Sequence, residues 1–218
     1  MKKLLVLLFS VFFLLSSPSV FADDISDFEI EGMSIGDSLL DYMTEDEILK
    51  EIELRKDGYS YLNESNKYVG VYLWKHNSST YDGISFFIKN NSSNKYITSK
   101  NEKYIIHSVR GMIDYIEDFD SCLVKRDEIV EVLSEMFPNA DKDENVYPHP
   151  ADFSGDSIKN DVYFLFDSGD YIEASCDNFE ETFRIKNNWS EGLNIVIKTS
   201  ENIKWLGNRK WYTFYENE

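Results

Sequence analysis

Apolar and polar residues alternate along several short segments, a pattern typical of β-strands that bury one face. Polar stretches rich in Asn and Ser separate the earlier segments, so the chain between them has the composition of tight turns. Consecutive strands joined in this way favour an antiparallel meander. The predicted strands are Tyr68–Trp74, Ile84–Lys89, Tyr104–Val109, Met112–Ile116 and Leu193–Lys198.

A β-hairpin is predicted further along the chain. Val162–Phe166 and Tyr171–Cys176 are two short runs of strand composition, and Asp167–Asp170 lies between them with the sequence Asp-Ser-Gly-Asp. A polar, glycine-containing connection of this length is typical of a hairpin turn.

A helix is predicted over Asp127–Phe137, where Ile129, Val132, Leu133 and Met136 fall on one face and Pro138 ends the pattern. The stretch Asn139–Lys159 that follows is rich in proline and polar residues, and we expect it to be irregular.

Shorter helices are predicted near both ends of the chain. Thr44 and Glu47 form a capping box before an apolar stripe, and Asp37 or Ser38 can cap a short turn of helix just before it. Ser200–Leu206 can form a terminal helix that ends at Gly207. The predicted fold class is therefore α+β, an antiparallel sheet with N-terminal helices and one central helix packed on it.

The first 22 residues have the three parts of a secretory signal peptide. Lys2 and Lys3 precede the 12-residue apolar run Leu4–Leu15, and Val20-Phe21-Ala22 offers small residues at a cleavage site. A membrane anchor would need roughly 20 apolar residues. We therefore expect residues 1–22 to be a cleaved signal peptide and 23–218 to be a single α+β domain without a membrane span, in the periplasm or outside the cell.

Composition narrows the function classes. The 218 residues include 22 Lys and Arg against 40 Asp and Glu, a net charge of −18, with 42% hydrophobic residues. That apolar content supports a packed core. An acidic surface argues against nucleic acid as a partner, because phosphate backbones bind basic surfaces.

Cys122 and Cys176 are the only two cysteines. In an oxidising compartment they can form a disulfide, which we expect to be structural. The bond would close a loop of about 54 residues and stabilise the fold by roughly 4 kcal/mol. Two separate buried thiols are the alternative.

The segment His149–Ser157 gathers groups used in hydrolysis. His149, Asp152, Ser154 and Asp156 are weak catalytic candidates, because a histidine, carboxylates and hydroxyls share one proline-containing loop. The local spacing is not that of a Ser-His-Asp triad, and no Gly-x-Ser-x-Gly turn is present. A surface loop with Asx and Ser turns is the alternative.

Calcium is the one cofactor for which the sequence offers a pattern. Asp141, Asp143 and Asn145 match the first three ligand positions of a calcium-binding loop, but the central glycine and the later glutamate are missing. A solvated acidic face is the alternative. We expect no other cofactor.

Four segments resemble a group of small exported proteins from marine Pelagibacter-type bacteria: Phe28–Leu40, Cys122–Phe137, His149–Ser157 and Ser168–Cys176. The resemblance spans most of the chain after residue 22. It implies export and a shared architecture, and it carries over no catalytic residue because the group has no assigned activity.

These observations favour an exported, non-enzymatic module that binds a small molecule or interacts with an envelope protein. The alternative is a small periplasmic hydrolase that uses the His149–Ser157 loop. The alternating aromatic segment Trp211–Tyr215 is a possible edge for a protein partner.

Overall fold

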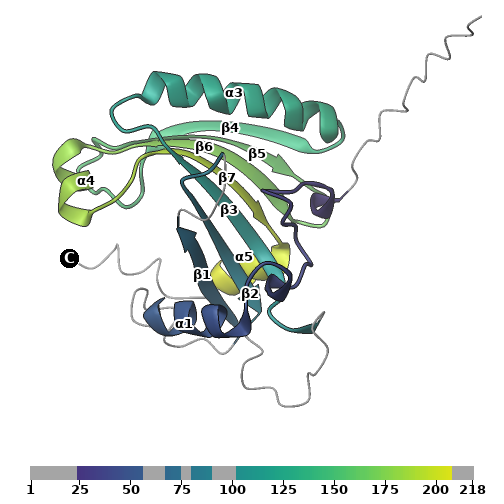
Figure 1. Cartoon of the computed structure of the whole chain (residues 1–218). Coiled ribbons are helices and arrows are strands. Elements are labelled where there is room, and N and C mark those ends of the chain that lie inside the picture. The colour runs from purple at the N-terminus through teal and green to yellow at the C-terminus, as the bar shows by residue number, and fades with distance from the viewer. Residues whose placement is uncertain (1–23, 56–66, 75–79, 90–101, 208–218) are drawn as a thin grey trace, which may run out of the picture.

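Two meanders of antiparallel strands join into one seven-stranded sheet (Figure 1). The computed structural model describes residues 24–55, 67–74, 80–89 and 102–207. The strand order is β1-β2-β3-β7-β6-β5-β4, and every neighbouring pair is antiparallel. The strands are β1 (Tyr68–Trp74), β2 (Gly83–Lys89), β3 (Ile106–Asp114), β4 (Asp141–Pro148), β5 (Ile158–Leu165), β6 (Tyr171–Asn178) and β7 (Gly192–Lys198).

One face of the sheet is apolar and lies under helices. Alternate residues of the strands form a single buried cluster there, because the register aligns Phe86, Val109 and Ile197 across neighbouring strands. Helix α1 (Glu45–Arg55) contacts β1, and α3 (Phe119–Met136) contacts β6 and β7. The 3-10 turns η1 (Ile25–Asp27) and η2 (Leu39–Asp41) add buried side chains to the same core.

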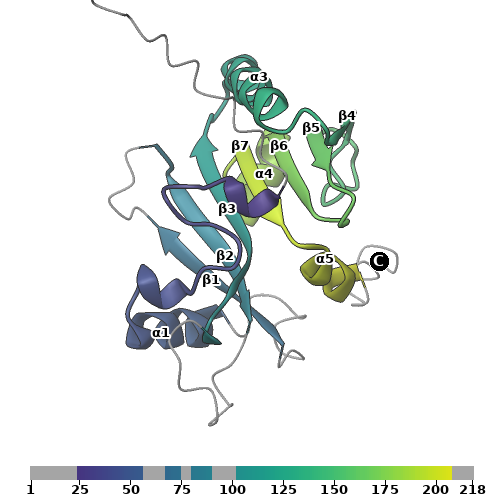
Figure 2. The ribbon, with the colours of Figure 1, turned by 90° about the vertical axis from the view of Figure 1, so that its right-hand side faces the viewer.

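The remaining helices are short. Helix α4 (Glu181–Asn187) connects β6 to β7, and α5 (Ser200–Gly207) follows β7. Trp205 and Leu206 of α5 pack on Tyr68 and Phe87, which point away from the apolar core. In Figure 2, β5, β6 and β7 run between α3 and α5. The two helices therefore cover different sides of the sheet.

The predicted strands and hairpin are confirmed, and so is the α+β fold class. Tyr104–Val109 and Met112–Ile116, which we expected as two strands, overlap one strand, β3. The turn Asp167–Asp170 joins β5 to β6 in register.

Hydrogen bonds confirm the two caps predicted near the N-terminus, at Thr44 and at Ser38. Thr44 N donates to Glu47 Oε2 at 2.9 Å, and Glu47 N donates to Thr44 Oγ1 at 3.4 Å, which is the capping box. Ser38 Oγ accepts from Leu40 N at 3.3 Å, although the turn that it caps is a three-residue 3-10 turn. Helix α5 ends at Gly207 as expected.

The central helix is longer than predicted and its buried face differs. It begins at Phe119, where Asp118 caps it, so the first two turns lie before the predicted start. Val132 is 54% exposed, whereas Val130 and Leu133 are buried. The prediction that Val132 faces the core was wrong, because the buried stripe begins at Cys122 and runs through Arg126 and Val130.

The stretch 139–159 is not irregular throughout, and that prediction was wrong. Residues 141–148 form β4, an edge strand that pairs along its whole length with β5. Asp141, Lys142, Asp143 and Glu144 are all exposed, so the strand has no apolar face at its start. An edge strand without a buried face leaves no alternation in the sequence.

Cys122 and Cys176 form the predicted disulfide, with 6.1 Å between their Cα atoms. Both residues are fully buried. The bond joins the second turn of α3 to β6, where Cys176 lies on the apolar face. It therefore fixes the helix over the sheet that it covers.

Several sequence predictions lie outside the described residues: the signal peptide 1–22, its cleavage site and the aromatic segment 211–215. Over the ranges that are described, no helix is both long enough and apolar enough to cross a membrane.

Candidate functional site

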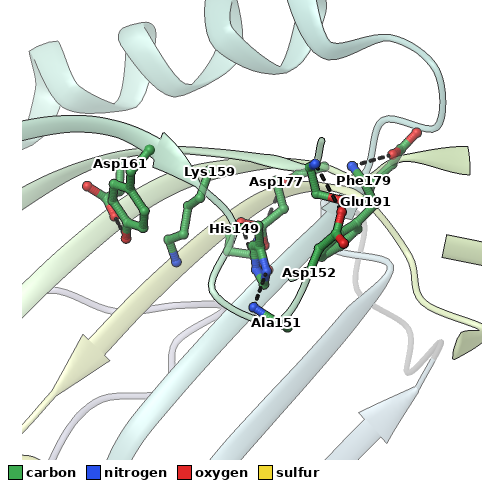
Figure 3. Close-up of polar contacts among 12 residues, drawn as sticks. His149, Ala151, Asp152, Lys159, Asp161, Asp177, Phe179 and Glu191 are labelled. Carbon is green, nitrogen blue, oxygen red and sulfur yellow. Dashed lines mark hydrogen bonds and ion pairs between the residues drawn. The ribbon is translucent and has the colours of Figure 1, made fainter. Parts of the chain in front are cut away.

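The second face of the sheet carries charged and aromatic side chains, and we call it the polar face. Strand register places these residues in rows: Tyr163, Glu173, Val196 and Arg110 are aligned across four neighbouring strands. In Figure 3, Lys159 and His149 lie on the side of the sheet away from α3. The polar face comprises Arg110, Tyr147, Lys159, Asp161, Tyr163, Tyr171, Glu173, Ser175, Asp177, Asn194 and Lys198.

A buried ion pair lies at the centre of the polar face. Lys159 Nζ lies 2.6 Å from Glu173 Oε1, and their side chains are 18% and 8% exposed. Burial alone would lower the pKa of Lys159 and raise that of Glu173, but their mutual attraction outweighs it. The pKa of Lys159 is therefore raised and that of Glu173 lowered, so both groups stay charged at neutral pH.

Asp161 lies beside this pair and is only partly satisfied. Its Oδ2 accepts a hydrogen bond of 2.5 Å from the Tyr147 hydroxyl. Burial and this hydrogen bond raise the pKa of Tyr147, which stays protonated. Asp161 is fully buried, and its Oδ1 has no hydrogen-bond partner within the described part of the chain. A buried acceptor without a donor is costly and is rare in native proteins.

A chain of polar contacts crosses from β3 to β6. Arg110 Nε and Nη2 donate to Asn194 Oδ1 at 2.8 and 2.5 Å, and Asn194 Nδ2 donates to Asp177 Oδ2 at 2.8 Å. The other oxygen of Asp177, Oδ1, is buried and has no hydrogen bond among the described residues. It lies 3.8 Å from His149 Nε2.

His149 is held in one orientation by its surroundings. Its Nδ1 accepts the backbone N–H of Ala151 at 3.2 Å, which assigns the ring proton to Nε2, on the side of Asp177 (Figure 3). Phe179 and Trp189 pack edge-on against the ring, with centroids 4.7 and 6.2 Å away. Burial lowers the pKa of His149, so the imidazole is neutral at pH 7.

Lys198 is the second lysine of the polar face, and no carboxylate lies within salt-bridge distance of it among the described residues. Its Nζ lies 5.6 Å from the ring centroid of Tyr171. Burial, together with Lys159 and Arg110, lowers the pKa of Lys198 to about 8, although Glu173 acts in the opposite direction. An amine with this pKa is partly neutral at physiological pH.

In the described structure, the candidate Ser154 bonds to Asp152, and neither serine hydroxyl of the His149–Ser157 loop donates to His149. The Asp152 carboxylate accepts from the backbone and hydroxyl of Ser154 at 3.0 and 2.7 Å, and from those of Ser157 at 3.1 and 2.6 Å. These bonds lower the pKa of Asp152 to about 2. Both hydroxyls thus donate to Asp152 rather than to His149, and Asp156 is exposed. The contacts organise the loop.

The calcium candidates Asp141, Asp143 and Asn145 lie on β4 rather than in a loop. Asn145 Nδ2 donates to Asp143 Oδ2 at 3.3 Å, so these two side chains bond to each other, and an extended strand spaces alternate residues by about 7 Å. In the described ranges, no group of three His, Cys, Asp or Glu residues is arranged to hold a metal ion. Calcium binding stays a prediction without the loop geometry on which it depended.

Comparisons with known proteins returned no relative. No family model, curated protein or solved structure matches this chain.

Sequence reasoning did not find the polar face. Its residues lie on strands separated by turns and by α4, and only the register brings them together. One signal was available in the sequence. Tyr171–Asp177 alternates Glu173, Ser175 and Asp177 with apolar residues, and carboxylates buried in a strand are often functional.

Proposed function

We propose that the protein is an exported, non-enzymatic binding module and that its ligand-binding surface is the polar face of the β3–β7 half of the sheet. The observation that carries this proposal is that two buried oxygens, Asp161 Oδ1 and Asp177 Oδ1, accept no hydrogen bond from the described residues. A ligand that donates hydrogen bonds to these oxygens would recover the free energy lost in burying them.

The free energy that it costs to bury charged side chains on the polar face supports a binding role. The face buries the ion pair Lys159–Glu173 and the side chains of Asp161 and Asp177, although apolar residues there would pack with less desolvation. Costly buried charge gathered on one face is typical of functional sites. Four aromatic rings frame it, which suits a small organic ligand. These are the rings of Tyr147, Tyr163, Tyr171 and His149.

Export is part of the proposal. The Cys122–Cys176 disulfide is of the kind that persists in the periplasm or outside the cell. The apolar run of residues 4–15 supplies the signal. A small molecule of that compartment is favoured as the ligand over an envelope protein, because the unpaired oxygens are buried rather than on an exposed edge.

A hydrolase that uses the His149–Ser157 loop finds less support. A nucleophilic hydroxyl needs a base within hydrogen-bond reach, and both hydroxyls donate to Asp152 instead.

The test is thermal denaturation of the purified, oxidised protein against a panel of sugars, amino acids, polyamines, carboxylates and phosphates. A ligand at 100 times its dissociation constant stabilises by about 2.7 kcal/mol, a shift of roughly 5–10 °C for a chain of this size. The shift should disappear in Asp161→Asn. It should persist in the control Glu131→Gln, because Glu131 is exposed on α3, on the other side of the sheet.

Two outcomes would contradict the proposal. A ligand that shifts wild type, Asp161→Asn and Glu131→Gln equally binds away from the polar face. Hydrolysis of a chromogenic ester that His149→Gln abolishes, with the melting temperature unchanged, would favour the enzyme.

A further inference from the structure

More positive than negative charge acts on the Lys198 ammonium group. The charged side chains that act on it are one carboxylate, Glu173, and two cations, Lys159 and Arg110. Glu173 is already engaged, because its Oε1 lies 2.6 Å from Lys159 Nζ. Neither Lys198 nor Arg110 therefore has a carboxylate of its own within salt-bridge distance among the described residues, although Asp177 is joined to Arg110 through Asn194.

Strand register places these two cations next to each other. Lys198 is opposite Ser108 on β3, and Arg110 is two residues further along that strand on the same face. They are diagonal neighbours across an antiparallel pair, close enough for long side chains to reach a common point. Asn194 holds the Arg110 guanidinium through Nε and Nη2, which fixes its orientation and leaves Nη1 for another acceptor.

The location of this positive charge is unusual for the chain. Acidic residues outnumber basic ones by 40 to 22 in the chain, whereas the polar face carries Lys159, Lys198 and Arg110 in equal number with Asp161, Glu173 and Asp177. The site is partly buried, where an ion pair is screened less than at the surface. The acidic remainder of the molecule repels a long polyanion, so a single anionic group fits better than a polymer.

We propose, building on the polar face as the ligand-binding surface, that the ligand is a small organic anion whose carboxylate or phosphate group lies between the Lys198 ammonium and the Arg110 guanidinium. The ring of Tyr171, beside Lys198, lines one side of this position. Lys198 contributes a point charge and Arg110 a planar donor, a combination suited to anionic oxygens.

An anion bound there has a consequence that can be measured in the wild-type protein. Negative charge beside Lys198 favours its protonated form, so binding must raise the pKa of Lys198 above its value of about 8. The titratable groups that face Lys198 are Lys159 on β5, Glu173 and Tyr171 on β6, and the charged Arg110 on β3. Of the two lysines, Lys198 titrates first as pH rises, because the ion pair with Glu173 raises the pKa of Lys159.

The experiment follows the ¹³Cε resonance of Lys198 between pH 6 and 11 in the full chain. Titrations with succinate and with inorganic phosphate, each at 20 mM, are compared with chloride at equal ionic strength. We expect either anion to raise the pKa of Lys198 by at least 0.5, and the stronger of the two identifies the carboxylate or the phosphate class. The inference would be overturned if neither anion changed the pKa of Lys198.

Variants separate this inference from the proposed function. Lys198→Met and Arg110→Gln should each weaken anion binding at least tenfold, whereas Lys142→Met, which removes an exposed lysine of β4, should leave it unchanged. Lys198→Arg keeps the charge and should retain most of the binding if Lys198→Met does not fold. A neutral ligand whose stabilisation is lost in Asp161→Asn and kept in Lys198→Met would overturn the anion site and leave the binding function standing.

Discussion

Lys159 and Glu173 form an ion pair across β5 and β6 at 2.6 Å, with both side chains buried. Replacing Glu173 with Gln leaves the lysine charge buried without its partner, and we expect a loss of about 3–5 kcal/mol in the free energy of unfolding. The double variant Lys159→Met/Glu173→Leu should lose markedly less. Urea denaturation at pH 7 measures each value.

An exposed ion pair on β4 is the matched control for Lys159 and Glu173. Lys142 and Glu144 lie 2.8 Å apart on β4, with side chains 42% and 59% exposed. Glu144→Gln should cost less than about 1 kcal/mol, because water screens exposed ion pairs. Equal losses for Glu144→Gln and Glu173→Gln would contradict the account of the polar face.

Asp152 should make the loop that it organises sensitive to acid. Its folded pKa of about 2 lies below the ordinary value near 3.9, so its ionised form stabilises the fold above pH 4. That contribution is lost as pH falls from about 4 through 2. Asp152→Asn should lower the melting temperature at pH 7, and the difference from wild type should shrink toward pH 2. A difference that is constant over this range would count against the hydrogen bonds to Ser154 and Ser157.

His149 should resist protonation in the folded state. Burial lowers its pKa below the ordinary 6.5, and Asp177, Lys159, Asp152 and Arg110 are the charged groups around it. The unfolded chain takes up this proton first, so stability falls as pH drops below about 6.5. A ¹⁵N–¹H NMR titration should show a pKa below 6.5 and the proton on Nε2. A proton on Nδ1 would contradict the hydrogen bond from Ala151.

The disulfide should provide a large share of the stability. Closing a loop of 54 residues contributes about 4 kcal/mol in the chain-entropy account. Reduction should therefore lower the melting temperature by roughly 10 °C. The same reductant should have no effect on the double variant Cys122→Ala/Cys176→Ala, and any shift there would mean that reduction acts through something other than this bond.

The sequence predicted those elements that require a periodic pattern of apolar residues or a particular capping residue. Leu193–Lys198 and the capping box at Thr44 are examples, because a buried face and a cap each demand particular residues. Strand β4 left no periodic pattern, since its first four side chains are exposed and none of its residues is fully buried. Helix α4 was missed for the same reason, as it has no buried residue.

The candidate site could not be predicted from the sequence, for a different reason. Lys159, Glu173 and Lys198 come from three strands, and their proximity depends on register that the composition of each strand does not determine. The loop candidates His149 and Asp152 were close in sequence and were therefore easier to notice. The structure gives Asp152 a role in holding the loop, while His149 borders the polar face through Asp177.

The Cys122–Cys176 bond also decides how the molecule responds to a protease. Phe153, 70% exposed, lies on the loop between β4 and β5, and every peptide bond from there to Cys176 is enclosed by the disulfide. A chain cut once in this loop has new termini but no separate fragments, because α3 and β6 remain covalently linked. It migrates as one band on a non-reducing gel and as two on a reducing gel. Cleavage at Phe153, the most exposed aromatic residue of the described ranges, therefore nicks this protein without dividing it.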